Sequence, residues 1–284
     1  MKKFVLISGL ILTACFASAK DIVNWQIIHW PPLMILENEG NKMTGEYALL
    51  MKLLQEHLTD YDHEYLEMSW ARFWSDIQIG KPICNIFAFK NPEREKYTEF
   101  SVPISIFLSN SLIMKKSTLK SLKLGDPKSI SLLKLMNKKG IKGFLEKSRS
   151  YSAPLDKLLS EHENGSNIYR QALKSAATVP MLLENRIDYL IEYPAIASYV
   201  RKKNMDIPGE IVSVQIEEIE PYTWGYLACP KNEWGKKLIG RVNNIAMREK
   251  STMYYHDLMK TATTNKTEIQ MIDDIYEEFV KATK

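Results

Sequence analysis

The stretch NPEREKYTEFSVP, residues 91–103, contains an arginine, Arg94. A run of apolar residues precedes this stretch. The preceding run, ICNIFAF, is typical of a buried strand, and ligands of parallel α/β sheets bind beyond the carboxyl ends of the strands. A guanidinium at such a place suits a carboxylate, because its planar donors match both oxygens and it keeps its charge. The alternative is a surface turn in which Arg94 pairs with Glu93 or Glu95, an interaction of about 0 to 1 kcal/mol.

Aromatic residues occur beside other predicted strand ends. Trp30 stands before two prolines that end the strand DIVNWQII, and either faces a ligand or belongs to the core. Trp70 directly precedes the predicted helix ARFWSDIQIG, and Arg72 lies in the first turn of that helix. Arg72 is a second candidate ligand residue, with a solvated or packing role as the alternative.

The patterns of several other chemistries are missing from the sequence. The five histidines include no HExxH and no pair at metal-ligand spacing, and no GxSxG is present. We therefore expect no metal, no cofactor and no catalytic residues. The net charge of +4 comes from 38 basic and 34 acidic residues, a balance that argues against a nucleic-acid-binding protein. With 284 residues, the chain is long enough for two modest lobes or one large domain.

The first nineteen residues have the pattern of a secretory signal peptide. Lys2 and Lys3 precede an apolar stretch, and Ala17-Ser18-Ala19 is a small-residue cleavage site. The rival interpretation is a lipoprotein signal with Cys15 acylated. No later apolar run approaches the ~20 residues that span a bilayer. The sequence thus predicts export to the periplasm, with lipid tethering as the alternative.

Two cysteines, Cys84 and Cys229, remain after the signal segment. An oxidising compartment would allow a disulfide between them, and two buried apolar thiols are the alternative. A lysine-rich segment, residues 115–147, lies between them with ten lysines. It is either a solvated face or a docking patch for a membrane or an anionic partner.

The order of predicted elements at the start of the chain is strand, helix, strand, helix, strand. This order favours a parallel sheet covered by helices. Later, SRSYSAPLDKLLSE joins a strand to a helix, where Ser150 and its neighbours could offer hydroxyls and a helix amino end to an anion. The tail MIDDIYEEFV has apolar residues at helical spacing and is expected to pack on the body of the protein.

These elements together resemble the type II periplasmic solute-binding proteins, and more narrowly the family 3 group that binds polar amino acids. The resemblance rests on Trp30-Pro31-Pro32, on Gly45 before a helix, and on Pro92-Glu93-Arg94-Glu95 followed by Phe100-Ser101-Val102-Pro103. It continues through SLIMKK, Asn185-Arg186-Ile187-Asp188 and GYLACPK, and covers roughly residues 22–260.

The resemblance implies two α/β lobes joined by two crossing hinge strands, SLIMKK outward and TWGYLACPK on return. Lobe 1 would comprise residues 20–112 and 228–284, and lobe 2 residues 113–227. A bridge between Cys84 and Cys229 would then be geometrically conceivable. The implied function is capture of a small solute between the lobes of a monomer, for an ABC-type transporter or a sensor in the inner membrane.

The same resemblance assigns roles to residues. Arg94 would bind the ligand's carboxylate, Trp30 would stack on the ligand, and an acid late in IDYLIEY would take an amino group. By spacing that last position is Tyr193, whereas the acid is Glu192, and strand neighbours face opposite ways.

Other positions depart from the family pattern. Phe87 and Phe89 replace the small hydroxyl residues before the arginine, and the acid expected after Gly45 is missing, with Glu46 and Tyr47 in its place. These departures predict an anionic ligand with an apolar or aromatic body, and an amino-acid-like ligand is the alternative. An enzyme on the same scaffold and an adaptor without a ligand remain as alternatives.

Overall fold

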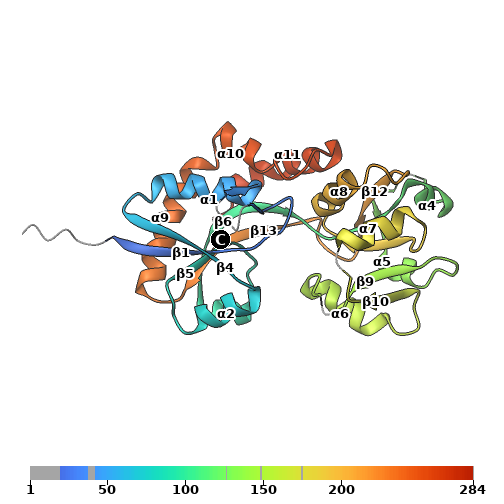
Figure 1. Ribbon diagram of the computed structural model, residues 1–284, viewed down its shortest axis with the longest axis horizontal. Helices are drawn as coiled ribbons and strands as arrows, with labels where there is room; N and C mark the ends of the chain where they lie inside the picture. Colours follow the sequence, from blue (N-terminus) through green and yellow to red (C-terminus); the bar gives the residue numbers. More distant parts are fainter. Residues whose placement is uncertain (1–19, 38–41, 126, 148, 174, 284) are drawn as a thin grey trace, which may run out of the picture.

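The computed structural model describes residues 20–37, 42–125, 127–147, 149–173 and 175–283. Its strands form two large sheets and a two-stranded ribbon, and helices surround each sheet (Figure 1). The predicted two-lobe α/β architecture is therefore confirmed. The proposed signal segment, with Cys15, lies outside the described residues.

The first sheet combines early strands with one strand from late in the chain. Its order is β4-β1-β5-β13-β6. The strands are β1 (Asp21–Ile27), β4 (Tyr61–Glu67), β5 (Ile83–Ala88), β6 (Thr98–Leu108) and β13 (Tyr222–Pro230). As predicted from the alternation of strands and helices, β1 is parallel to both β4 and β5. β13 is antiparallel to β5 and β6.

Helices cover both faces of the first sheet. The larger core packs beneath α1 (Glu46–His57), α9 (Glu233–Glu249) and α10 (Met253–Leu258). A smaller core lies beneath α2 (Trp70–Gln78), where Phe73 and Ile77 contact the opposite face. The ribbon of β2 (Ile35–Glu37) and β3 (Lys42–Thr44) precedes α1, and the short helix α3 (Pro92–Glu95) follows β5.

The second sheet has the order β10-β9-β11-β7-β12-β8. Its strands are β7 (Ser111–Lys115), β8 (Ser129–Ile130), β9 (Gly143–Glu146), β10 (Ile168–Gln171), β11 (Tyr189–Glu192) and β12 (Ile211–Ile216). One core packs under α4 (Lys116–Ser121), α5 (Leu132–Met136) and α6 (Ala153–His162). The other core packs under α7 (Ser175–Leu183) and α8 (Pro194–Lys203).

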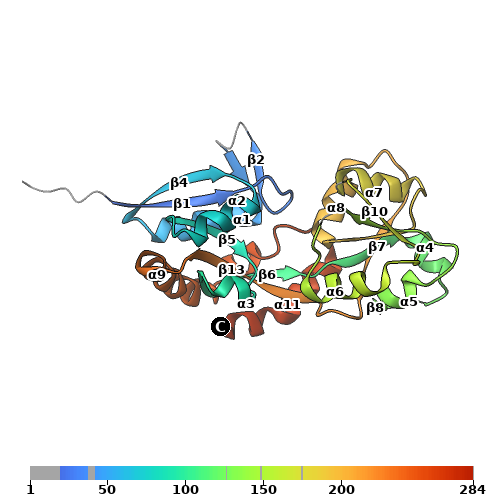
Figure 2. The same ribbon diagram turned by 90° about the horizontal axis from the view of Figure 1, so that it is seen from below.

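Two neighbouring chain segments connect the sheets (Figure 2). β6 and β13 pair from Thr98–Pro230 to Leu108–Tyr222, and Ser109 N donates to Pro221 O at 2.9 Å just beyond the ladder. The return strand TWGYLACPK was therefore placed correctly. SLIMKK is not the outgoing hinge strand that the sequence predicted. The outgoing connection follows β6, and SLIMKK forms β7, which pairs with both β11 and β12 inside the second sheet.

The C-terminal helix α11 (Lys266–Lys281) packs on the body, as its apolar spacing predicted. Ile272 and Phe279 belong to the larger core of the first sheet. On the side of the second sheet, Gln215 Nε2 donates to Met271 Sδ at 3.6 Å. Figure 1 shows α11 lying between α10 and α8. This helix thus contacts structure on both sides of the connecting strands.

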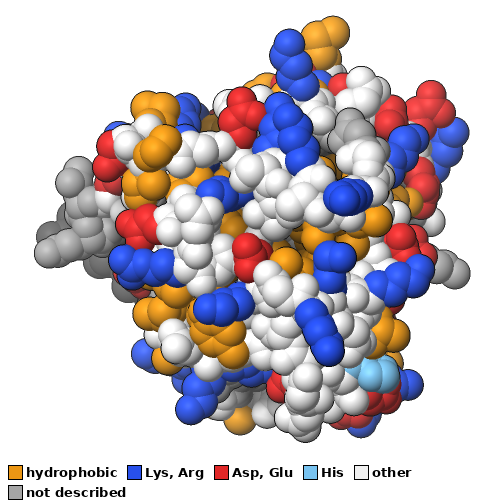
Figure 3. Space-filling view, turned by 90° about the vertical axis from the view of Figure 1, so that its right-hand side faces the viewer, with side chains coloured by type: hydrophobic (Ala, Val, Ile, Leu, Met, Phe, Trp, Pro, Cys, Tyr) orange, Lys and Arg blue, Asp and Glu red, His pale blue; other side chains and the backbone are white. Residues whose placement is uncertain are grey.

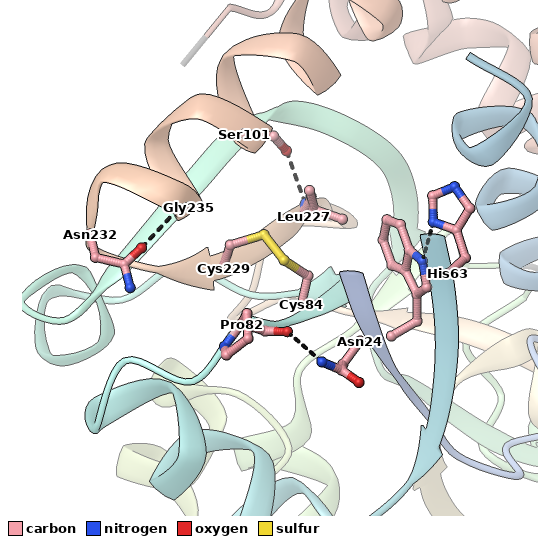
Figure 4. The surroundings of a disulfide bond; sticks show 10 residues. Asn24, His63, Pro82, Cys84, Ser101, Leu227, Cys229, Asn232 and Gly235 are labelled. Carbon is pink, nitrogen blue, oxygen red and sulfur yellow. Dashed lines mark hydrogen bonds between the residues drawn. A yellow bond between two sulfur atoms is a disulfide. The ribbon is translucent and has the colours of Figure 1, made fainter. Parts of the chain in front are cut away.

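A disulfide joins Cys84 on β5 to Cys229 on β13 (Figure 4). Both cysteines are fully buried, and the strands that carry them are neighbours in the first sheet. Of the two alternatives that the sequence left open, the structure has the bridge. It closes a segment of 145 residues that contains the whole second sheet.

Lys250 fixes the end of α11 from inside the protein. Its side chain is fully buried, and Nζ donates to the carbonyls of Phe279, Ala282 and Pro103 at 2.7, 2.9 and 3.2 Å. Burial lowers the pKa of Lys250 to about 8. An unfolded lysine has a pKa of about 10.4. Between these values the unfolded state therefore binds more protons than the folded state.

We therefore expect the free energy of unfolding to contain a Lys250 contribution that rises as the pH increases from about 8 to about 10. Chemical denaturation of the wild type and of Lys250→Met across this range would isolate the contribution, because tyrosine titration is common to both proteins and cancels in the difference. A difference that stays constant over the whole range would contradict the prediction.

Candidate ligand-binding site

Aromatic side chains connect the strand ends of the two sheets. Trp30, which follows β1, and Tyr193, which follows β11, have ring centroids 5.9 Å apart. Phe107, near the end of β6, lies 5.8 Å from Trp30 and 4.7 Å from Tyr193. Trp30 and Tyr193 are half-buried. The junction between the sheets thus includes two rings, Trp30 and Tyr193, that keep part of their surface exposed beside the buried Phe107.

Arg94 is positioned by the short helix α3 beyond the carboxyl end of β5. Asn91 caps this helix, because its Oδ1 accepts a hydrogen bond from Arg94 N at 2.8 Å. The guanidinium Nη1 donates to the Phe89 carbonyl at 2.9 Å. The guanidinium carbon lies 4.1 Å from the centroid of the Trp74 ring, which is a cation–π contact.

Arg94 makes no ion pair with a carboxylate in the part of the chain that the structure describes. Glu93, one of the two neighbours considered as its partner, accepts from Lys96 Nζ at 2.7 Å instead. Burial lowers the pKa of Arg94, although a guanidinium stays charged at neutral pH. A half-buried cation without a carboxylate can accommodate an external anion through charge-assisted hydrogen bonds.

Lys90 places a second cation at the end of the same strand. Its Nζ lies 4.4 Å from the centroid of the Tyr226 ring and 5.8 Å from that of Phe100. Burial lowers the pKa of Lys90, and it forms no ion pair within the described ranges. Lys90 was not among the site residues predicted from the sequence. Its position at the carboxyl end of ICNIFAF, four residues before Arg94, was the available signal.

On the second sheet, Glu192 is held by Arg149. The two guanidinium nitrogens Nη1 and Nη2 donate to Oε2 and Oε1, each at 2.6 Å. Glu192 is 1% exposed, whereas the Arg149 side chain is 19% exposed. Burial alone would lower the pKa of Arg149, but the Glu192 charge more than offsets this and raises it. Arg149 also lies over the rings of Tyr151 and Tyr193, at 4.7 and 5.5 Å.

Of the comparisons with known proteins, only the comparison with solved structures found similar proteins. No protein-family model matches the sequence, and no curated protein matches it either. The structure is similar to the probable amino-acid ABC transporter extracellular-binding protein ytmK of Bacillus subtilis. The TM-score is 0.65 at 16% identity, over 84% of this chain and 96% of that one. A histidine kinase sensor domain with similarity to periplasmic binding proteins matches with a TM-score of 0.59 at 17% identity, over 84% and 93% of the chains.

This chain has the fold of a periplasmic binding protein. A third structure of this fold is the amino acid ABC transporter substrate-binding protein AbpA of Streptococcus pneumoniae, bound to L-arginine. Its TM-score is 0.60 at 19% identity, over 86% of this chain and 94% of AbpA. The resemblance inferred from the sequence is therefore confirmed at the level of the fold.

Within this periplasmic-binding-protein fold, the departures from the family pattern pack against one another. Tyr47 and Phe87 have nearly parallel rings with centroids 4.4 Å apart. Glu46 is 3% exposed, and burial raises its pKa well above the ordinary value. The Phe87 ring, which stands where the family pattern has a small hydroxyl residue, therefore stacks on the Tyr47 ring.

The remaining residues proposed on the first lobe have different surroundings. The Trp70 ring stacks on Trp74 at 6.3 Å and meets Phe87 edge-on at 5.2 Å. Phe89 meets Phe107 edge-on at 5.2 Å. Trp70 and Phe89 are therefore connected to Trp30, because Trp30 also contacts Phe87 and Phe107. The Arg72 side chain is 68% exposed, and its Nε lies 3.8 Å from a carboxylate oxygen of Asp76 on the same helix.

On the second lobe, Ser150 contacts its own helix start. Its hydroxyl contacts the Asp156 carboxylate, which also accepts from Tyr151 N at 2.9 Å. Ser150 and Asp156 line an open hollow of about 410 Å³, together with Arg149, Ser160, Glu163 and Arg170. The Ser150 hydroxyl, which the sequence predicted as a possible contact for an anion, therefore borders a polar hollow beside Arg149.

The described residues contain no group of three or more His, Cys, Asp or Glu side chains arranged to hold a metal ion. None of their helices combines the length and the apolar character that a membrane crossing requires.

Proposed function

We propose that this protein is an exported, non-enzymatic solute-binding protein that captures a small anionic ligand with an apolar or aromatic body. The proposed ligand binds between lobe 1, residues 20–112 and 228–284, and lobe 2, residues 113–227. A signal peptide at residues 1–19 would direct the protein to the periplasm. Closure would be driven by contacts made from both lobes, because a ligand shifts an equilibrium only through its differential affinity.

The arrangement of charges carries the proposal. Arg94 has no carboxylate partner among the described residues, so it is available for an external anion. The acid expected to take an amino group, Glu192, is bound through both oxygens by Arg149. Lys90 adds a further cation beyond the end of β5. This arrangement favours an anion over a zwitterionic α-amino acid, because the amine would need a carboxylate that Arg149 already neutralises.

The aromatic lining supports an apolar or aromatic body for the ligand. Trp30, Trp70, Trp74, Phe89 and Tyr193 gather around the same junction. Such rings bind flat apolar groups through large contact areas. Two of the similar structures are named for transporters and one for a sensor, so an ABC-type transporter or a sensor is the proposed partner.

A thermal-shift screen of the purified protein tests this function. Aromatic carboxylates and dicarboxylates are expected to raise the melting temperature, and neutral sugars and amides of the same carboxylates are not. Mass spectrometry of each stabilising compound after incubation would detect turnover, which would overturn the non-enzymatic part of the proposal. Stabilisation by amino acids alone would refute the anionic ligand, and no stabilisation by any compound would favour an adaptor.

Arg94→Ala is expected to weaken binding of a carboxylate found in that screen by about 1.5 to 3 kcal/mol, because hydrogen bonds to charged groups contribute about that much. Isothermal titration calorimetry would measure the change. The matched control is Arg248→Ala on the same lobe, since Arg248 is exposed and pairs with Glu249 at 2.8 Å. Equal affinity of the Arg94 variant and the wild type would remove Arg94 from the site.

A further inference from the structure

The lysine-rich part of the chain contributes to one edge of the second sheet. At this edge β7 ends and β9, β11 and β12 begin, since Met114 pairs with Tyr189, Tyr189 with Gly143, and Lys115 with Ile211. Arg149 and Tyr193 follow β9 and β11 at the opposite edge. The edge that carries the lysines is therefore separate from the candidate ligand site.

Three contacts tie together the chain segments at this edge. The Lys115 amine contacts the side chain of Asn185. Lys142 N donates to the Asp188 carboxylate at 2.8 Å, and Lys116 N donates to Glu210 O at 2.9 Å. The segments before β9, β11 and β12 thus lie side by side with the start of α4.

The exposed cations that these segments bring together are all lysines. We call them the basic edge: Lys116, Lys138, Lys139, Lys142, Lys202 and Lys203. The two nearby arginines are engaged within the chain, because Arg186 pairs with Glu184 at 3.0 Å and Arg201 donates to the carbonyls of Gly209 and Asn204. Of the basic edge, Lys116 is partly neutralised by Glu210 at 2.9 Å.

An exposed apolar side chain lies beside these cations. Met205, two residues after Lys203, is 72% exposed. Figure 3 shows this end of the molecule, with Lys and Arg side chains spread over the face and fewer Asp and Glu between them. The asymmetry extends to the whole lobe. Residues 113–227 hold 18 Lys and Arg against 13 Asp and Glu, whereas residues 20–112 and 228–284 together hold 18 against 21.

We propose that the basic edge docks on the surface of an anionic lipid bilayer, with Met205 entering the interface. Protein interfaces are enriched in arginine and depleted in lysine, whereas lysine clusters bind anionic lipid headgroups through charge without a shaped pocket. The basic edge consists of lysines alone, which is the composition of a cluster that binds anionic lipid headgroups. Docking there would hold the protein near a membrane while the candidate ligand site stays at the other edge of the sheet.

Co-sedimentation with lipid vesicles tests this proposal without any ligand, so its outcome is independent of the proposed function. We expect binding at low salt to phosphatidylcholine vesicles that contain phosphatidylglycerol, and loss of binding at high salt, because screening shortens the range of the attraction. Pure phosphatidylcholine vesicles should bind little protein. Replacing Lys138, Lys139 and Lys142 together by glutamine should weaken binding by roughly fivefold for each lysine.

The matched control replaces Lys52, Lys236 and Lys237 by glutamine, which changes the net charge equally on the first lobe. Each of these pairs with an acid on its own lobe: Glu56, Glu233 and Asp21, respectively. The control should retain most of the binding. Equal loss in both triple variants, or equal binding to neutral vesicles, would overturn the proposal. So would failure to bind anionic vesicles combined with binding to polyglutamate, because the edge would then suit an acidic protein partner.

Discussion

Replacing both Cys84 and Cys229 by serine is expected to lower the free energy of unfolding by about 3 to 5 kcal/mol. The bridge closes a segment of 145 residues, and a loop of that length restricts the unfolded chain strongly. Both sulfur atoms are buried between helices and sheet, so two hydroxyls would also enter an apolar core. Urea denaturation of the wild type and of the variant would measure the difference.

The two single variants provide the control for this prediction. Cys84→Ser alone and Cys229→Ser alone should each cause most of the loss, and the double variant little more, because either change removes the same bond. Reductant should destabilise the wild type and leave the double variant unaffected. Additive effects of the single variants, with no response to reductant, would show that the cysteines are not bridged.

Glu192→Gln is expected to destabilise the protein by about 2 to 4 kcal/mol. Removing one partner of a buried ion pair typically costs about 3 to 5 kcal/mol, and two features of Arg149 reduce this cost: its longer contact with Glu146 at 3.8 Å and the 19% exposure of its side chain to water. Glutamine keeps the shape of the side chain, so the loss reports on the charge. Thermal and chemical denaturation would both detect a change of this size.

The matched control is Glu184→Gln, which breaks the exposed pair with Arg186 on the same lobe. The side chains of that pair are 41% and 67% exposed, so the expected change is within about 1 kcal/mol. The double variant Glu192→Leu with Arg149→Met should be less destabilised than Glu192→Gln, because no charge remains buried alone. Similar stabilities of Glu192→Gln and Glu184→Gln would contradict the view that Glu192 neutralises Arg149.

The buried pair also separates two interpretations of the ligand. If Glu192 served an amino group, its replacement would weaken binding of amino acids and leave the fold largely intact. If it holds Arg149, as the 2.6 Å contacts indicate, the main loss is in stability. Measuring both quantities on the same variant distinguishes these roles.

Local patterns in the sequence determined much of the architecture. The alternation of strand and helix in residues 21–89 predicted the parallel arrangement of β1, β4 and β5. The same alternation placed Arg94 beyond a strand end, because the carboxyl end of a strand is fixed by chain direction alone. The helical spacing of the tail predicted α11, whose core contacts follow from that spacing.

Only the tertiary structure decided which distant residues meet. Arg149 and Glu192 are 43 residues apart, and Cys84 and Cys229 are 145 apart, so no local period relates them. The position of SLIMKK inside the second sheet depends on its pairing with β11 and β12, and the edge where the lysines gather depends on the same strand order. The sequence determined which elements form, because propensity and hydrophobic period act over a few residues. The partners of each charge were decided by strand order, which arises from the packing of the whole chain.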